Sequence, residues 1–189
     1  IIIAGGMESM SNAPYLLEKM RSGARIGHSD VKDHMFLDGL EDAYDKGKLM
    51  GVFADATAQK YGFSREEQDQ FALTSLARAN EAIEKGHFVG EISPVTVKSR
   101  KGETVIDTDE QPGKARPEKI PTLRPAFAKD GTVTAANASS ISDGASAIIM
   151  MRISEAEKRG LKPIARIVGH SVHAQEPCWF TTAPVGAIK

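Results

Sequence analysis

The sequence predicts an α/β fold in which a layered core is interrupted by a long mixed insertion. Three observations support this prediction. The chain opens with the β-branched run Ile1–Ala4, which is typical of a buried strand. Its centre, residues 64–85, carries the pattern of an amphipathic helix. From Ala147 to Val172 the pattern is strand, helix and strand, so core elements occur on both sides of the insertion.

The composition is that of a globular protein. The 189 residues suffice for one ordinary domain with a large insertion, and hydrophobic and charged residues make up 41% and 26%. A net charge of −1 gives no basic field for nucleic acid, and no apolar run is long enough to span a membrane. The single cysteine, Cys178, excludes an internal disulfide framework and fits a reducing, cytoplasmic compartment.

Both ends of the chain have the pattern of interior segments. The first residues show neither an initiator Met nor a basic leader region. The last residues, 183–189, have the pattern of a first helical turn, with Pro184 where its missing N–H costs nothing. We therefore expect the sequence to be a central piece of a longer chain.

An irregular stretch and a short helix are predicted before the central helix. Residues 8–48 are rich in Gly, Asp, Ser and Met and show weak periodicity. A helix is expected from about residue 51 to 61, where Gly62 stops it.

The central helix, residues 64–85, has a signal at each end. Ser64 and Glu67 match a capping box, in which each side chain accepts a hydrogen bond from a free backbone N–H near the other. Gly86 supplies a left-handed cap at the other end. The residues expected on its apolar face are Ala72, Leu76, Ala79 and Ile83.

A hairpin and a polar loop follow this helix. Residues 92–98 alternate around Val95 and Val97, and the pair Val105-Ile106 is the expected partner strand. The stretch from 108 to 122 contains three prolines and several basic residues, and it is predicted to be a loop.

The last part of the chain returns to apolar segments. Residues 147–151 are predicted to be a buried strand. Ser154 begins a second capping box and a short helix that Gly160 ends, and residues 164–172 are predicted to be a third strand.

Few side chains suggest catalysis on their own. Cys178 could be a nucleophile, but its sequence neighbours offer neither a cation nor a helix N-terminus to lower its pKa. Glu8, which follows a glycine pair, could be a catalytic carboxylate, although bonding to backbone amides of its own turn is the stronger interpretation. The five histidines lack metal-ligand spacing, so no metal site is predicted.

Two segments could bind an anion or an amide. Residues 137–140 followed by Asp143-Gly144 suggest a turn beside a helix start, although such turns are more often only turns. Lys114, Arg116 and Lys119 could meet phosphates, and a solvated basic face is the alternative. The residues alone indicate an α/β domain without an assignable function.

Four segments, in order along the chain, resemble the thiolase family. Together they cover essentially the whole sequence, which makes the resemblance much stronger than a lone Gly-Gly would. The four are Ala4–Ser11; Met50-Gly51 with the helix start Ser64–Asp69; Leu123–Phe127 with Asp130–Ser139; and Asp143–Ala145 continuing through Arg166–Val168 to Glu176–Pro184.

The resemblance implies a fold. It suggests a partial thiolase-like layered α/β core, residues 1–10 and 137–189, with an inserted mixed loop domain, residues 11–136, that covers coenzyme A. Thiolases are commonly dimers or tetramers, so a homodimer or homotetramer is expected for the intact protein.

The resemblance also implies a reaction. Thiolases join two acyl-CoA molecules, or cleave a 3-ketoacyl-CoA with free CoA, through an acylated cysteine. In the family the nucleophilic cysteine lies upstream of the segment matching Ile1. The catalytic histidine and second cysteine lie downstream of the segment matching Lys189. No catalytic residue is therefore expected in this chain, and Cys178 matches neither cysteine. The CoA thioester is a substrate, so no cofactor is implied.

What carries over is CoA binding. The resemblance places Leu49 and Met50 at the pantetheine and acyl region. Small residues allow a backbone to approach the thin pantetheine chain, and cations pair with the phosphates of CoA. The other expected contacts are Ala135, Ala138 and Ser139 along the pantetheine amides, Phe127 and Phe180 nearby, and Lys114, Arg116 or Lys119 at the nucleotide end.

Several alternatives stay open at this point. Many short-chain members have His where this chain has Leu49, and Met is usual where it has Phe180. An acetoacetyl-CoA thiolase and a longer-chain degradative thiolase of fatty acid metabolism therefore both fit. A different class also fits: a non-catalytic CoA-binding or oligomerisation module derived from the fold. Neither a nucleic acid nor a membrane is expected as a partner.

Overall fold

The computed structural model describes all residues from 1 to 189 and contains both helices and strands. Its contacts divide the chain into two compact units. Unit 1 comprises Ile1–Thr57 and Ser140–Lys189, and unit 2 comprises Ala58–Ser139. The division into a core of residues 1–10 and 137–189 and a loop domain of residues 11–136 is a statement about family architecture, and it stays a prediction.

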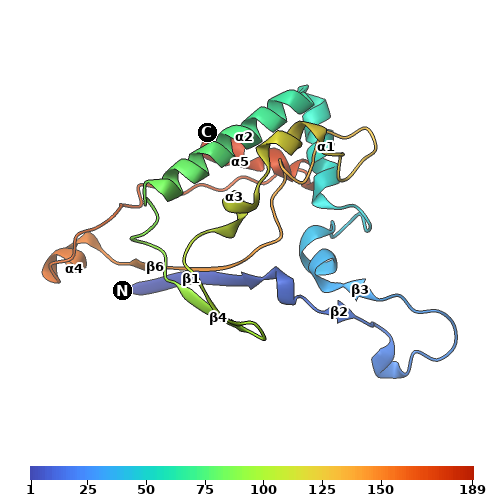
Figure 1. Ribbon diagram of the computed structural model, residues 1–189, viewed down its shortest axis with the longest axis horizontal. Helices are drawn as coiled ribbons and strands as arrows, with labels where there is room; N and C mark the ends of the chain where they lie inside the picture. Colours follow the sequence, from blue (N-terminus) through green and yellow to red (C-terminus); the bar gives the residue numbers. More distant parts are fainter. The chain divides into compact units, whose positions relative to one another are not determined.

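An antiparallel ribbon joins the two sequence segments of unit 1. Strands β1 (Ile2–Ser9) and β6 (Asp143–Met150) pair in register from Ile2 opposite Met150 to Ser9 opposite Asp143. Figure 1 shows the two strands side by side. The strands predicted at residues 1–4 and 147–151 are therefore confirmed, and both are longer than predicted.

The predicted burial of these two strands is wrong. Ile3 is 72% exposed and Ile149 is 66% exposed. A two-stranded ladder satisfies the backbone groups between its strands, but its side chains are buried only where another layer packs on a face. The apolar runs therefore predicted the positions of the two strands correctly and the burial of their side chains incorrectly.

A side-chain contact closes one end of the ribbon. Asp143 accepts a hydrogen bond from the N–H of Ser11 at 2.9 Å, and the Ser11 hydroxyl donates to the same carboxylate. The Ser11 hydroxyl, followed by its N–H, holds the pKa of Asp143 below the usual value, because both bonds favour the charged carboxylate.

The stretch predicted to be irregular contains only short elements. They are β2 (Tyr15–Leu16) paired with β3 (Lys32–Asp33), two single-turn 3-10 helices (Met10–Asn12 and Met20–Ser22) and a π-helix (Phe36–Leu40). Helix α1 (Met50–Tyr61) follows, and Gly62 beyond it has φ +71. The predicted helix at residues 51–61 and its glycine stop are confirmed.

Residues 151–172 depart from the prediction twice. Helix α4 (Ile153–Lys158) has Arg152 as its N-cap, with no side-chain cap bond, so the predicted capping box at Ser154 is wrong. Ser154 already lies inside the first turn. Gly160 follows the helix with φ +64, as predicted.

The third predicted strand, residues 164–172, is also wrong. No segment of the chain pairs with it, and Ile164 and Val168 are 105% and 87% exposed. β-branched residues favour extended backbone, but a strand also needs a hydrogen-bonded neighbour.

The C-terminal segment of unit 1 is helical. A 3-10 helix (Pro177–Thr182) leads into α5 (Ala183–Ile188), which has Pro184 in its first turn. The predicted helix start is confirmed.

Helix α2 (Arg65–Glu84) is the longest element of unit 2, and its predicted signals are confirmed. Ser64 accepts from the N–H of Glu67, and the Glu67 carboxylate accepts from the N–H of Ser64 at 2.8 Å. Gly86 has φ +67. The residues predicted on the apolar face of α2 are all half-buried: Ala72, Leu76, Ala79 and Ile83.

The remaining elements of unit 2 are a hairpin and two short helices. Strands β4 (Val95–Ser99) and β5 (Gly102–Ile106) pair as predicted. The stretch predicted to be a polar loop contains α3 (Glu110–Lys114) and a 3-10 helix (Pro117–Thr122). In the whole structure, no helix combines the length and the apolar character that crossing a membrane requires.

Candidate functional site

The side chain of Asn137 holds the segment 132–139 in unit 2. Its Nδ2 donates to the carbonyl of Thr132 at 3.1 Å, and its Oδ1 accepts from the N–H of Thr134 at 2.7 Å. These backbone groups flank Val133, so the amide pairs with the chain much as a neighbouring strand would. A side chain thus replaces a missing backbone partner.

Thr134 closes the turn that follows. Its side chain is fully buried, and its Oγ1 accepts from the N–H of Ala136 at 3.2 Å. The Thr134 carbonyl accepts from the N–H of Ala138 at 3.1 Å. On the other side, the N–H of Ala126 donates to the Val133 carbonyl at 2.9 Å. The backbone of this segment is therefore bonded on both sides.

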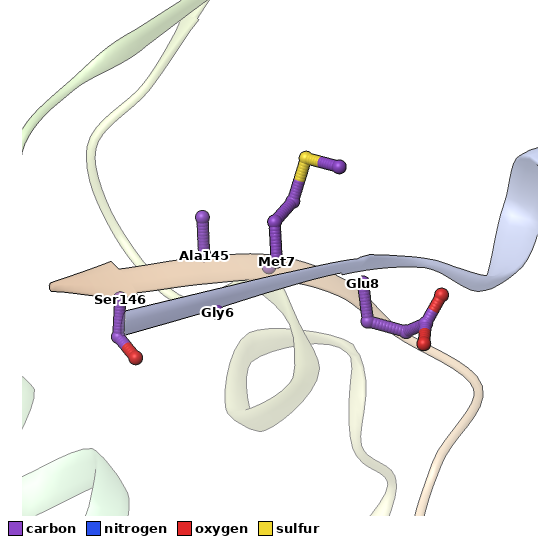
Figure 2. Close-up of a pocket in the computed structure, with 6 residues that line it drawn as sticks. Gly6, Met7, Glu8, Ala145 and Ser146 are labelled. Atoms are coloured by element: carbon purple, nitrogen blue, oxygen red, sulfur yellow. The ribbon is translucent and has the colours of Figure 1, made fainter. Parts of the chain in front are cut away.

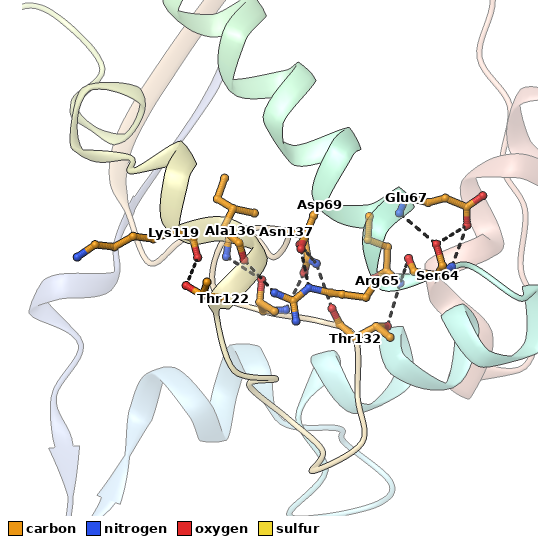
Figure 3. A network of polar contacts seen from close by, with 12 residues as sticks. Ser64, Arg65, Glu67, Asp69, Lys119, Thr122, Thr132, Ala136 and Asn137 are labelled. Atoms are coloured by element: carbon orange, nitrogen blue, oxygen red, sulfur yellow. Dashed lines mark hydrogen bonds and ion pairs between the residues drawn. The ribbon is translucent and has the colours of Figure 1, made fainter.

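Helix α2 supplies an ion pair that supports the segment 132–139. Asp69, only 6% exposed, accepts from Arg65 Nε at 2.8 Å, and Arg65 Nη2 donates to the carbonyl of buried Ile120 at 2.9 Å. Asn137 Nδ2 also reaches Asp69 Oδ1, at 3.5 Å. Gln68 adds a bond from Nε2 to Thr132 Oγ1 at 2.9 Å. Figure 3 shows these contacts as one network between the helix and the segment.

Four predicted binding residues lie on or beside this segment. Ala135 and Ser139 are exposed and Ala138 is half-buried, whereas Thr134 beside them is buried. Phe127, half-buried, follows directly after the residue whose N–H bonds to Val133. The small residues therefore occupy the accessible side of a segment whose other side is fixed.

The three predicted cations lie close together in sequence and are all exposed. Lys114 ends α3 and pairs with Glu110 one turn earlier, at 2.9 Å. Arg116 precedes the 3-10 helix Pro117–Thr122, and Lys119 lies within it. Lys114 already has an anionic neighbour on its own helix, so Arg116 and Lys119 are the better candidates for a phosphate.

The other three predicted residues belong to unit 1. Leu49 forms an isolated β-bridge with Glu41, and Met50 begins α1 and is 43% exposed. Phe180 is 40% exposed and meets Phe53 of α1 edge-on, with ring centroids 6.2 Å apart. A bond of 2.6 Å between Thr57 and Thr181 ties the same two segments together.

Glu8 lies on the ribbon in a shallow depression whose other lining residues are Gly6, Met7, Gly144, Ala145 and Ser146. Figure 2 shows that Glu8 and Ser146 project from one face of the ribbon, while Met7 and Ala145 project from the other. The Glu8 carboxylate accepts from the N–H of Ser9 at 3.0 Å. The structure thus supports the interpretation in which this carboxylate bonds to a backbone amide, but Glu8 lies within strand β1, so the turn predicted at this position is wrong.

Cys178 has a neighbour that its local sequence did not reveal. It is half-buried in the 3-10 helix Pro177–Thr182. Asp45 chiefly raises the pKa of Lys48, and Cys178 contributes to the same shift more weakly. Lys48 and Cys178 therefore interact electrostatically within unit 1, although none of the residues adjacent to Cys178 in sequence is basic.

Comparison with known proteins decides the family. The model of the thiolase N-terminal domain matches residues 1–154. The chain belongs to the thiolase family. A probable acetyl-CoA acetyltransferase of Dictyostelium discoideum is 49% identical over 99% of this chain and 45% of its own length. An acetyl-CoA acetyltransferase of Pseudomonas aeruginosa is 46% identical over 100% of this chain and 48% of its own length.

Solved thiolase structures confirm the predicted α/β fold. The acetyl-CoA acetyltransferase from Syntrophomonas wolfei matches with a TM-score of 0.89 at 44% identity, and that from Bacillus anthracis with 0.91 at 42%. Each match covers 98% of this chain and 47% of the other. This thiolase chain spans about half the length of the relatives that it matches.

The sequence did not identify the side chains that fix the segment 132–139. For Asn137 the sequence indicates only a place in a turn. Arg65 and Asp69 have the i,i+4 spacing of a helical ion pair, a signal that is present in the sequence. Their burial beneath a segment more than sixty residues away leaves no local signal.

Proposed function

We propose that the intact protein containing this chain is an acyltransferase of the acetyl-CoA acetyltransferase type, and that this chain supplies part of its CoA-binding surface. One observation carries the proposal. Proteins named acetyl-CoA acetyltransferases match the chain over 99–100% of its length at 46–49% identity. The proposed reaction is formation or thiolysis of acetoacetyl-CoA or another 3-ketoacyl-CoA.

The fixed segment of unit 2 supports a role in binding the pantetheine arm. Pantetheine is thin and carries two amides, so it suits a surface of small side chains with a few polar groups. Ala135 and Ala138 allow close approach, and the exposed hydroxyl of Ser139 can donate or accept a hydrogen bond. Phe127 would pack beside the arm.

Cations in unit 2 are proposed to meet the nucleotide end. Arg116 and Lys119 are exposed, and an arginine can hold a phosphate with two parallel hydrogen bonds. Lys114 is a weaker candidate because Glu110 lies beside it. In unit 1, the proposed contacts are Leu49, Met50 and Phe180 at the pantetheine and acyl region.

The proposed role of this chain is binding, and the bond-making groups are proposed to lie in other segments of the intact protein. Thioester exchange needs a cysteine thiolate, a group that sets its ionisation, and an acid or base for the carbon–carbon step. This chain would hold the carrier arm, so that the thioester meets those groups in a fixed position.

The decisive experiment is an assay of the intact protein with acetoacetyl-CoA and free CoA, followed by chromatography of the acyl-CoA products. Acetyl-CoA formation is expected. If CoA binds in calorimetry but no 3-ketoacyl-CoA is cleaved, the non-catalytic module is correct instead. A panel of 3-ketoacyl-CoA chain lengths then distinguishes a short-chain enzyme from a degradative one of fatty acid metabolism.

The contribution of Ser139 can be tested separately with Ser139→Ala. Loss of one hydrogen bond should weaken CoA binding about three- to tenfold. Ser140→Ala is the matched control, because Ser140 is the exposed neighbour whose hydroxyl pairs with Ser142 at 2.8 Å. An equal effect of both substitutions would remove Ser139 from the proposed contacts.

We further propose a cytoplasmic homodimer or homotetramer. The single cysteine favours a reducing compartment, and the oligomer follows from the family resemblance. Light scattering of the intact protein measures the mass of the assembly, and cell fractionation tests the compartment.

A further inference from the structure

The amide of Asn137 performs a task that few side chains can perform. It must donate to one backbone group and accept from another, two residues apart along the chain. Asparagine carries a donor and an acceptor at this reach, whereas aspartate offers acceptors only. An aspartate here would lose the bond to the Thr132 carbonyl and would place a second carboxylate beside Asp69.

Asp69 gives that amide a fixed orientation. Its buried carboxylate accepts from Arg65 at one oxygen and faces Asn137 Nδ2 at the other. Arg65 is itself fixed by the Ile120 carbonyl. The network therefore runs from helix α2 through two side chains to the backbone of the segment 132–139, and all of it lies within unit 2.

Burial along this segment changes sharply over a few residues. Val133 and Thr134 are 6% and 0% exposed, whereas Ala135 and Ser139 are open to solvent. The groups that hold the segment are thus separate from the groups that can touch a ligand. A surface held in this way gives up little conformational entropy when a ligand binds.

We propose that Asn137 and Asp69 are positioning residues for the pantetheine arm of CoA. Neither touches the ligand. They fix the backbone of residues 132–139 so that its small exposed residues present one rigid surface. This inference rests on the proposed function, since it takes the pantetheine arm as the ligand of that surface.

The test compares Asn137→Asp with the unmodified intact protein. We expect the Kd for CoA and the KM for the acyl-CoA to rise about tenfold, while kcat changes less than about twofold. Hydrogen exchange should accelerate at the N–H of Ala138, which bonds to the Thr134 carbonyl, and stay unchanged in the middle of α2.

Two further variants keep the proposal falsifiable. Asn80→Asp makes the same amide-to-carboxylate change elsewhere on α2, and it should leave KM and exchange unchanged. Asp69→Asn keeps the shape of its side chain, removes the charge and should raise KM to a smaller extent. It decides the question if Asn137→Asp does not fold.

The double variant Asn137→Asp with Asp69→Asn is the most specific test. It again places an amide opposite a carboxylate, so its KM should lie below the raised KM of Asn137→Asp. A general loss of stability would not produce such a recovery.

The outcomes separate this inference from the proposed function. If the unmodified protein binds CoA and Asn137→Asp loosens the segment without changing KM, the positioning role is wrong and the proposed function stands. A fall in kcat alone at constant KM overturns the positioning role as well. If the unmodified protein binds no CoA, the proposed function fails and this inference fails with it.

Discussion

The segment 132–139 of unit 2 and the β1–β6 ribbon of unit 1 are fixed by opposite means. Besides two backbone bonds, the segment depends on side chains: Asn137 supplies the missing peptide partner, and Arg65 and Asp69 fix Asn137. The ribbon is held by its backbone ladder, and nearly all its side chains are exposed. The segment thus depends on hydrogen bonds from particular side chains, whereas the ribbon depends on hydrogen bonds between backbone groups.

This difference predicts where each region tolerates change. The ribbon should accept most side-chain substitutions, because its bonds are between backbone groups that every residue carries. The segment should accept few, because its bonds depend on particular donors and acceptors. Two exceptions are expected. The ribbon should not tolerate a side chain where a glycine allows the strands to approach closely, and the segment should tolerate substitution where its residues face solvent.

The largest effect is expected for Gly5→Ala, which would break the ribbon through its backbone. A Cβ at position 5 would lie closer than 3.0 Å to the Ser146 carbonyl oxygen and 3.0 Å from Ala147 Cα. Backbone cannot yield as a side chain can, so we expect a loss of about 3 kcal/mol in the free energy of unfolding of the ribbon. Hydrogen exchange of the β1 and β6 amides measures it.

Gly6→Ala is the matched control for that substitution. Nothing lies within 4 Å of a Cβ built at Gly6, so the same change should be neutral or slightly stabilising. Equal losses from both variants would show that the ribbon needs glycine for conformational freedom rather than for the close approach of β6.

The elements that the sequence predicted well are those with local signals. The capping box of Ser64 and Glu67 and the stop at Gly86 lie within a few residues of the helix ends that they define. The hairpin at residues 95–106 is also local, since its two strands are joined by a short turn. In each case, residues close together in the sequence were sufficient to predict the element.

The features that the sequence predicted wrongly or did not predict depend on partners far away in the sequence. Residues 164–172 were predicted to form a strand, but no segment of the chain pairs with them. For the candidate site, Ala135 and Ser139 came from family resemblance, and the structure adds that they are accessible. The role of Asn137 depends on Asp69 in another element, which no local pattern could reveal.

The next effect in size tests the side-chain network of unit 2. Asp69→Ala removes a buried carboxylate and leaves Arg65, whose side chain is 20% exposed, without its ion-pair partner. Because Arg65 can still reach water, we expect a loss of about 2 kcal/mol rather than the larger cost of a fully buried pair. Urea denaturation followed by circular dichroism measures the change.

Glu66→Ala provides the comparison for Asp69→Ala. Glu66 is an exposed acid on the same helix turn, so its loss should change stability by less than about 0.5 kcal/mol. If the two variants lose equal stability, helix charge rather than the buried network explains the effect.

A smaller effect is expected for Ser64→Ala, which removes the cap of α2. The N–H of Glu67 loses its acceptor, and such losses cost about 1 kcal/mol. Ser75→Ala, in the exposed middle of α2, should be neutral or slightly stabilising because alanine favours helix. Thermal unfolding of both variants measures the difference, and a Ser75→Ala loss as large as that of Ser64→Ala would contradict the capping argument.

The smallest effect concerns pH and the end of the ribbon. Ser11 lowers the pKa of Asp143, so the charged carboxylate stabilises the folded ribbon. This contribution is complete above the unfolded pKa of about 4, and it disappears as the pH falls through the lower folded pKa. Asp143→Asn should therefore lower the urea midpoint at pH 6 and leave it nearly unchanged at pH 2. Asp130→Asn, the same neutralisation in an exposed loop of unit 2, should not reproduce that pattern. An Asp143→Asn loss that is equal at both pH values would show that side-chain shape, rather than the charge of Asp143, closes the ribbon.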